Sequence, residues 1–110
     1  MGDYVEVIMQ IAFWGLGSIA KRHIRNMNAI LKKRNICYRI DVYRHTKKEI
    51  EDSDICQIIT GVYEMSELSD RHYDVIFITN PTSLHFEALQ QCIKHADCFF
   101  IEKPVFADAD

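Results

Sequence analysis

The spacing of hydrophobic and polar residues along the chain predicts strands that alternate with helices. Residues 5–13 are almost continuously apolar, as in a parallel strand that is covered on both faces. From Ser18 onward, apolar residues recur at helical spacing opposite a basic face, so we expect an amphipathic helix of about four turns. Its apolar positions are Ala20, Ile24, Met27 and Leu31. Residues 36–43 alternate like a strand whose less buried face carries Arg39 and Asp41.

The middle of the chain carries weaker signals. A short polar helix is expected over 46–52, with Thr46 as its cap, and a brief strand is expected within 57–62. A helical turn is then expected from Ser66. Residues 74–79 form the clearest strand of the sequence, because the apolar run is stopped at once by an Asn-Pro pair.

The last third predicts one more helix and one more strand. Thr82 or Ser83 is expected to cap a helix, and residues 98–102 are expected to form the final strand. The apolar stripe of that helix consists of Leu84, Ala88, Leu89, Cys92 and Ile93. Strands alternating with helices favour right-handed crossovers, so the expected fold is α/β: a doubly wound parallel sheet of the Rossmann type, in three layers. With 110 residues, 48% of them hydrophobic, the chain is expected to form one domain over 1–110.

Composition excludes several kinds of partner. The 13 basic and 16 acidic residues are spread along the chain and give a net charge of −3, so we expect no nucleic acid partner. The N-terminal apolar run is too short to span a bilayer and follows acidic residues, which favours a cytoplasmic protein without a membrane anchor. The cysteines lack metal-ligand spacing, so we expect no metal and interpret them as small core residues. They are Cys37, Cys56, Cys92 and Cys98.

The segment 15–20, GLGSIA, fits the pattern G-x-G-x-x-G/A between a buried strand and an amphipathic helix, which is the context that this phosphate-binding motif requires. Gly15 permits the tight turn, and Gly17 lets the backbone approach a pyrophosphate. The amides of Ser18 and Ile19 then face the phosphates at the positive end of the helix. Taken alone, the motif also fits a simple tight turn or a methyltransferase.

In such a fold, a side chain at the end of the second strand distinguishes NAD from NADP. Asp41 lies inside the strand pattern, so Arg44 is expected at the tip, with Tyr43 placed to lie against an adenine. Because an arginine at this point accepts a 2′-phosphate, the sequence leans slightly toward NADP over NAD. The alternative is that Arg44 is a solvated loop cation.

Two further motifs end the later strands. They are TNPTSLH over 79–85 and IEKP over 101–104. Together with GLGSIA, and in this order, they make residues 5–105 similar to the N-terminal nucleotide-binding domain of the Gfo/Idh/MocA family, named for glucose-fructose oxidoreductase and inositol dehydrogenase. The resemblance implies hydride transfer between NAD(P) and a carbon of a sugar, cyclitol or nucleotide sugar. A methyltransferase is disfavoured because it gives no role to the IEKP motif.

The resemblance also implies roles for individual residues. Glu102 would help to place the nicotinamide ribose, and Lys103 would be the catalytic residue at the reacting oxygen. There its ammonium group stabilises developing negative charge and takes part in proton transfer. Pro104 is expected to follow a cis peptide bond. The residues implied on the nicotinamide side are Thr79, Asn80, Pro81 and His85, although a local hydrogen bond is an equal alternative for the histidine.

Two features depart from the pattern of the family. Trp14 stands before the first glycine, where the family usually has a smaller apolar residue. The partner aspartate and histidine of the family belong to a second, substrate-binding domain, which we expect to be absent from residues 1–110. We therefore expect cofactor binding without turnover, and self-association through an apolar surface near Phe99 and Phe106. The alternative to an enzyme is a non-enzymatic module that senses NAD(P) and controls a partner.

Overall fold

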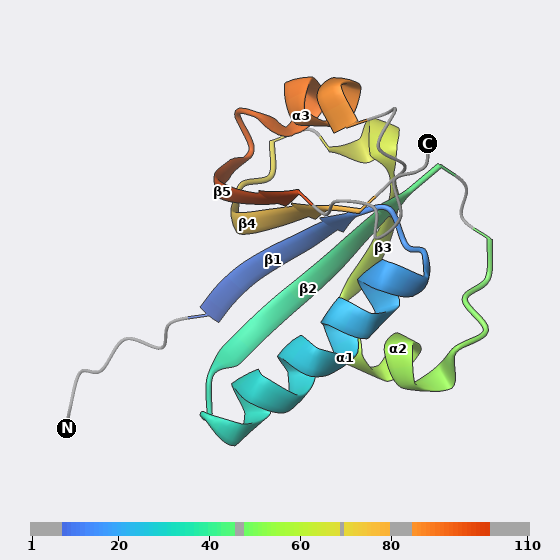
Figure 1. Ribbon diagram of the computed structural model, residues 1–110, viewed down its shortest axis with the longest axis vertical. Coiled ribbons are helices and arrows are strands. Elements are labelled where there is room, and N and C mark those ends of the chain that lie inside the picture. The colour runs from blue at the N-terminus through green and yellow to red at the C-terminus, as the bar shows by residue number, and fades with distance from the viewer. Residues whose placement is uncertain (1–7, 46–47, 69, 80–84, 102–110) are drawn as a thin grey trace, which may run out of the picture.

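A computed structural model describes residues 8–45, 48–68, 70–79 and 85–101, with only the backbone of His85. Five strands form one sheet in the order β3-β2-β1-β4-β5, and every neighbouring pair is parallel (Figure 1). The strands are β1 (Ile8–Trp14), β2 (Cys37–Arg44), β3 (Gly61–Glu64), β4 (Tyr73–Ile78) and β5 (Ala96–Ile101). The helices are α1 (Ser18–Lys33), α2 (Ser53–Ile58), the 3-10 turn η1 (Met65–Glu67) and α3 (His85–Cys92). The expected α/β fold with a doubly wound parallel sheet is confirmed.

Helix α1 forms where the apolar spacing predicts it and ends through local backbone chemistry. Its stripe is buried at Ala20, Ile24 and Leu31. At the C-terminal end, the amide of Asn35 donates to the carbonyl of Lys32, and that of Ile36 donates to the carbonyl of Leu31. Asn35 has a φ of 57°, so it takes the left-handed position that glycine often fills after a helix.

The helices cover the two faces of the sheet and bury two separate sets of side chains (Figure 1). On one face, α1 and α2 pack against Ile11 and Phe13 of β1. On the other face, Ala88 and Cys92 of α3 pack near Ala12 and Trp14. The carboxyl half of β1 is therefore buried on both faces, which explains why its sequence is almost continuously apolar. The three expected layers are confirmed.

The segment between β2 and β4 differs from the expectation. Residues 48–52 are not helical, and α2 begins only at Ser53, because Ile55 of the later segment is the residue buried against the α1 side of the sheet. The strand predicted within 57–62 is wrong at its start, since β3 begins at Gly61. The turn predicted from Ser66 is confirmed as η1, where the amide of Glu64 donates to the carboxylate of Glu67 at 2.7 Å.

Several predicted core positions lie at the surface instead. The interpretation of the cysteines as core residues holds only for Cys92, whose burial raises the pKa of its thiol to about 12. The exposed cysteines are Cys37, Cys56 and Cys98. Ile93 follows the last turn of α3 and is 53% exposed, so it lies outside the apolar stripe predicted for that helix.

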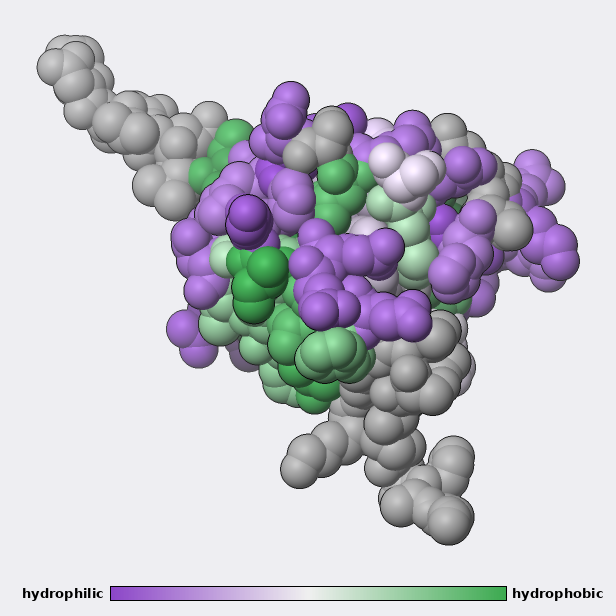
Figure 2. Space-filling model, turned by 90° about the horizontal axis from the view of Figure 1, so that it is seen from above, coloured by the Kyte–Doolittle hydropathy of each residue, from purple (hydrophilic) through white to green (hydrophobic). Residues whose placement is uncertain are grey.

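The surface is mostly hydrophilic on the face that Figure 2 shows, with hydrophobic patches between the polar side chains. Phe99 is half-buried against the core, whereas its neighbour Phe100, on the opposite side of β5, is 45% exposed. Phe106 lies outside the described residues. Among the helices of the described segments, none is long and apolar enough to cross a membrane. Within the same segments, no three His, Cys, Asp or Glu side chains are grouped as metal ligands.

Candidate functional site

The topology places the reversal of the strand order at the carboxyl ends of β1 and β4. From β1 the chain proceeds to β2 and β3 on one side, and it returns to β4 and β5 on the other. In open parallel sheets, ligands bind at the point where the strand order reverses in this way. The turn 15–17 follows β1 and Thr79 follows β4, so the structure brings the first glycine motif and the first residue of the second motif to the same edge of the sheet.

Gly15 has the conformation that a tight turn after β1 requires. Its φ is 108°, in a region that side chains other than glycine rarely occupy. Its amide donates to the carbonyl of Tyr43 at the end of β2, with a distance of 2.9 Å. The turn is thus fixed by the neighbouring strand.

Gly17 differs from Gly15, because neither its backbone conformation nor its surroundings require a glycine. It is the N-cap of α1 with a φ of −99°, which any residue can adopt. A Cβ atom added at Gly17 would meet no other atom of the described chain within 4 Å, so the fold itself does not need glycine here. The missing side chain leaves open space before the helix, as a bound phosphate group requires.

The first turn of α1 presents amides toward this space. Gly17 provides no side-chain cap, and its carbonyl accepts the first helical hydrogen bond, from the amide of Lys21 at 3.0 Å. Ser18 is exposed and Ile19 is half-buried. In a 16-residue helix the backbone dipoles favour an anion at this end.

Thr79 connects the end of β4 to the glycine turn. Its amide donates to the carbonyl of Trp14 at 3.1 Å. Its hydroxyl lies 3.3 Å from that oxygen and 3.2 Å from the carbonyl oxygen of Gly15. Thr79 was expected to line the nicotinamide side, and the structure places it beside the glycine turn, with its hydroxyl proton engaged by that turn.

The two aromatic residues near the turn belong to the core. Trp14 is 2% exposed, and its ring lies 5.4 Å from that of Tyr43, so the bulky residue before Gly15 is accommodated inside the fold. Tyr43 is fully buried, and its hydroxyl lies 2.6 Å from that of Tyr73. The expected contact of the Tyr43 ring with an adenine is therefore wrong for this structure; its backbone carbonyl, which holds Gly15, is the group that serves the site.

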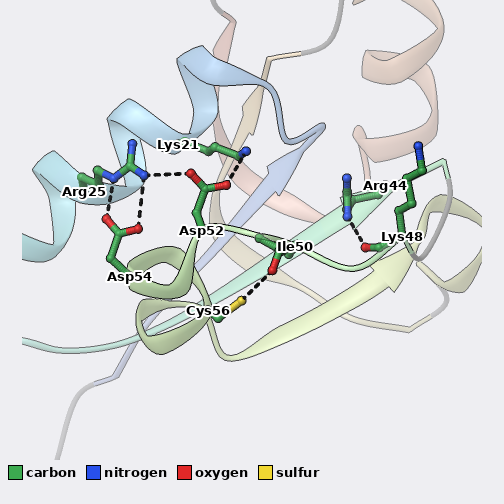
Figure 3. Close-up of polar contacts among 8 residues, drawn as sticks. All are labelled: Lys21, Arg25, Arg44, Lys48, Ile50, Asp52, Asp54 and Cys56. Carbon is green, nitrogen blue, oxygen red and sulfur yellow. Dashed lines mark hydrogen bonds and ion pairs between the residues drawn. The ribbon is translucent and has the colours of Figure 1, made fainter.

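Arg44 ends β2, as the sequence predicts, and is half-buried. Its Nη1 donates to the carbonyl of Lys48 at 2.6 Å, within the loop that follows the strand (Figure 3). Asp41 lies three residues earlier and is 1% exposed, so it does not reach the tip. It was expected on a less buried face of the strand, and hydrogen-bonding partners explain its burial instead.

An ion-pair network that the sequence analysis missed holds the start of α2 against α1 (Figure 3). Lys21 lies 2.6 Å from Asp52, and Arg25 contacts Asp52 at 3.1 Å and Asp54 at 2.6 Å. The hydrogen bond from Lys21 lowers the pKa of Asp52, and that from Arg25 lowers the pKa of Asp54. The signal was present in the sequence as two cations four residues apart on one helix face.

The predicted nicotinamide half of the site lies largely outside the described residues. His85 begins α3, but its side chain is not described. The other residues outside the described ranges are Asn80, Pro81, Glu102, Lys103 and Pro104. The cis peptide expected before the proline belongs to the same undescribed segment.

Comparison with known proteins identifies the family whose pattern the chain matches. Residues 9–110 match Gfo/Idh/MocA, described as an oxidoreductase family with an NAD-binding Rossmann fold. The chain is also 32% identical over 98 residues to the oxidoreductase YrbE of Bacillus subtilis. That alignment covers 87% of this chain and 28% of YrbE, so the chain spans less than a third of its relative.

Two solved structures of scyllo-inositol dehydrogenase from Lactobacillus casei share the fold. The apo form is 22% identical to this chain, with a TM-score of 0.64. The match covers 96% of this chain and 31% of the dehydrogenase chain. A second form, with NAD(H) and scyllo-inositol bound to that enzyme, is 21% identical with a TM-score of 0.64. This second match covers 93% of this chain and 30% of the dehydrogenase chain.

Proposed function

Because this chain belongs to the Gfo/Idh/MocA oxidoreductase family, with its NAD-binding Rossmann fold, we propose that it is the cofactor domain of an NAD(P)-dependent oxidoreductase. The observation that carries the proposal is the contrast between the two glycines of the turn. Gly15 is needed by the backbone, whereas Gly17 leaves open space that the fold does not use. A bound pyrophosphate gives that second glycine its purpose.

The chain's own groups suit a pyrophosphate. The amides of Ser18 and Ile19 open a 16-residue helix that Gly17 leaves without a side-chain cap. These donors and the helix dipole favour negative charge, and Thr79 fixes the turn that carries them. The residues present therefore fit the phosphate portion of NAD(P).

Arg44 supports a preference for NADP over NAD. It occupies the strand-end position at which a ribose is read, and the guanidinium is held by the Lys48 carbonyl on the adjoining loop. Asp41, the acidic residue of β2, is buried in the interior. It therefore does not take the place of Arg44 at the end of the strand. An arginine at this point pairs with a 2′-phosphate through charge-assisted hydrogen bonds.

The proposed reaction is hydride transfer to or from a sugar, cyclitol or nucleotide sugar. The bound nicotinamide would supply the redox chemistry. Lys103 is proposed to lie at the reacting oxygen, where an ammonium group stabilises negative charge and exchanges a proton. Asn80, Pro81, His85 and Glu102 are proposed on the nicotinamide side by position in the family motifs. The inositol bound to the Lactobacillus casei enzyme supports a polyhydroxylated substrate.

A second domain is proposed to complete the substrate site. This chain spans 28% of YrbE and about the same share of the inositol dehydrogenase structures. Residues 1–110 are then expected to bind the cofactor without turnover, because an open rim neither orients nor desolvates a substrate. The complete enzyme is proposed to act in the cytoplasm.

The test is calorimetric titration of this chain with NADPH, NADH and S-adenosylmethionine. We expect binding of NADPH, weaker binding of NADH and none of S-adenosylmethionine. Binding of S-adenosylmethionine alone would overturn the assignment of the site. The assignment would also be overturned if NAD(P) bound neither to residues 1–110 nor to a longer chain that includes a substrate domain.

A further inference from the structure

Asp52 occupies the N-cap position of α2 but does not cap that helix. An aspartate at an N-cap usually accepts hydrogen bonds from the first backbone amides of its own helix. Here the side chain makes no such bond, and both of its oxygen atoms contact cations of α1 instead. Oδ1 lies 2.6 Å from Nζ of Lys21, and Oδ2 lies 3.1 Å from Nη2 of Arg25 (Figure 3). The carboxylate therefore joins two elements instead of stabilising one.

Asp52 is also the last residue of segment 48–52, which is neither helix nor strand. The first residue of the segment is Lys48, whose carbonyl accepts a hydrogen bond from Nη1 of Arg44 at 2.6 Å. The middle residue is Ile50, whose side chain packs against the core on the α1 side of the sheet. Contacts at its two ends and at its centre thus fix the path of the segment between Arg44 and α1 (Figure 3).

The Lys48 carbonyl is the group that holds the guanidinium of Arg44. Glu64 lies opposite Arg44 in the neighbouring strand, but its carboxylate accepts a hydrogen bond from the amide of Glu67 at η1. Among the residues that the structure describes, no carboxylate forms an ion pair with Arg44. The direction of the guanidinium therefore depends on where the backbone of Lys48 lies.

The pair between Asp52 and Lys21 joins the segment to the part of α1 at which the pyrophosphate is proposed to bind. The amide of Lys21 donates to the carbonyl of Gly17 at 3.0 Å, so this lysine belongs to the first turn of the helix. One end of segment 48–52 is thus fixed to the proposed pyrophosphate site. Its other end holds Arg44, which is proposed to bind the 2′-phosphate.

We propose that Asp52 is a positioning residue for the preference for NADP over NAD. Its pairs with α1 place segment 48–52, and the carbonyl of Lys48 then orients the Arg44 guanidinium for the 2′-phosphate. This inference rests on the proposed function and adds to it the residue that holds Arg44 in place before the nucleotide binds. A side chain that is already held in its binding conformation loses less freedom when the ligand binds, so the affinity rises.

The sign of the effect distinguishes positioning from simple electrostatics. Removing the negative charge of Asp52 near a bound phosphate would by itself strengthen NADPH binding, because a repulsion is lost. Loss of positioning instead weakens NADPH binding, because the nucleotide must then immobilise the side chain of Arg44. NADH lacks the 2′-phosphate and does not depend on that side chain. A fall in the ratio of NADPH to NADH affinity is therefore the mark of positioning.

The experiment is calorimetric titration of the parent chain and of matched variants with NADPH and NADH. We expect Asp52→Asn to lower the ratio of NADPH to NADH affinity about fivefold. Asp54→Asn is the matched control, because it removes a carboxylate that also pairs with Arg25, at 2.6 Å, but lies inside α2 and outside the segment. It should leave the ratio unchanged. Asp52→Glu keeps the charge and should retain most of the ratio of the parent chain.

A double variant tests whether Asp52 acts through Arg44. In the Arg44→Ser background, Asp52→Asn should leave the ratio of affinities unchanged, because the residue through which it acts is gone. Urea unfolding confirms that each variant is folded under the conditions of the titration. If residues 1–110 bind neither nucleotide, the same variants are compared in a longer chain that includes a substrate domain.

The outcomes separate this inference from the proposed function. A parent chain that binds neither nucleotide in either length would overturn the proposed cofactor site and the role of Asp52 with it. A parent chain that binds both nucleotides without preferring NADPH would overturn the role of Asp52 alone. So would an unchanged or raised ratio in Asp52→Asn, an equal fall in Asp54→Asn, or an undiminished effect in the Arg44→Ser background.

Discussion

The hydroxyl of Thr79 lies 3.2 Å from the backbone carbonyl of Gly15, so the end of β4 is fastened to the turn that follows β1. These two strands flank the point where the strand order reverses. The contact joins residues 64 positions apart and explains how a flexible glycine turn is held in one conformation. A hydrogen bond between the ends of the two strands thus fixes the turn of the proposed cofactor site.

Replacing that hydroxyl tests the contact. Thr79→Val keeps the shape of the side chain and removes the donor, so we expect it to lower the free energy of unfolding by about 1 kcal/mol. Thr79→Ser keeps the hydroxyl and should retain most of that free energy. Urea unfolding measures both variants. A valine variant as stable as the parent chain would show that the bond does not hold the turn.

Gly15 should tolerate no side chain. Gly15→Ala places a Cβ atom at a φ of 108°, with an expected cost of about 1–3 kcal/mol in unfolding free energy. Gly17→Ser is the control, since its backbone is extended and its Cβ would meet open space. Thermal or urea unfolding compares the two. Equal stability of the two variants would contradict the division of roles between the glycines.

Arg44 should determine the choice between cofactors. Arg44→Ser is expected to weaken NADPH binding about tenfold or more, because a charge-assisted hydrogen bond contributes about 1.5–3 kcal/mol, and to leave NADH binding unchanged. Arg34→Ser, at the far end of α1, is the control for loss of one positive charge. Calorimetry with each nucleotide provides the ratio of affinities. An equal loss of affinity for NADH and NADPH would contradict this prediction, because Arg44 would then only maintain the structure of the loop.

The ion-pair network should stabilise the fold in a pH-dependent manner. Lys21 and Arg25 lower the pKa of Asp52 and Asp54, so both carboxylates bind protons less readily in the folded state. Their contribution is complete above the unfolded pKa of about 3.9 and is lost as the pH falls through the lower folded values. Asp52→Asn should therefore reduce the urea midpoint at pH 7 and have progressively less effect toward pH 3.

Two controls distinguish the network from a general charge effect. Asp70→Asn removes an exposed carboxylate elsewhere and should leave the midpoint unchanged at each pH. High salt should shrink the effect of Asp52→Asn, because screening weakens exposed pairs. An effect of Asp52→Asn that stays constant from pH 7 to pH 3 would contradict the assigned pKa directions.

Periodic segments of the sequence predicted their structure well, and the segment between β2 and β4 did not. In α1 the spacing of Ala20, Ile24 and Leu31 alone identifies the buried face. The region around α2 has no such period: its start at Ser53 depends on packing of Ile55 against another element and on ion pairs from α1. Such tertiary contacts override local propensity, so the β-branched residues after Cys56 suggested a strand too early.

The features of the candidate site that depend on backbone conformation were predictable from the sequence. The glycine spacing predicted the turn, and the alternating pattern that places Asp41 inside the strand predicted Arg44 at the end of β2. The interior role of Tyr43 was not predictable, because it depends on Tyr73, which lies 30 residues away and supplies its hydroxyl partner. The burial of Asp41 has the same origin, since two of its partners, Tyr73 and Arg71, come from about 30 residues later in the chain.

The most direct test of the proposed cofactor site is NADPH titration of the parent chain and of Gly17→Asp. Aspartate is a favoured N-cap and would occupy open space, so the fold should be at least as stable as before. The same side chain places a negative charge where the pyrophosphate is proposed to bind. We predict that the folded variant loses NADPH binding while the parent chain binds. Unchanged NADPH affinity in Gly17→Asp would contradict the account, because the turn would then not be the pyrophosphate site.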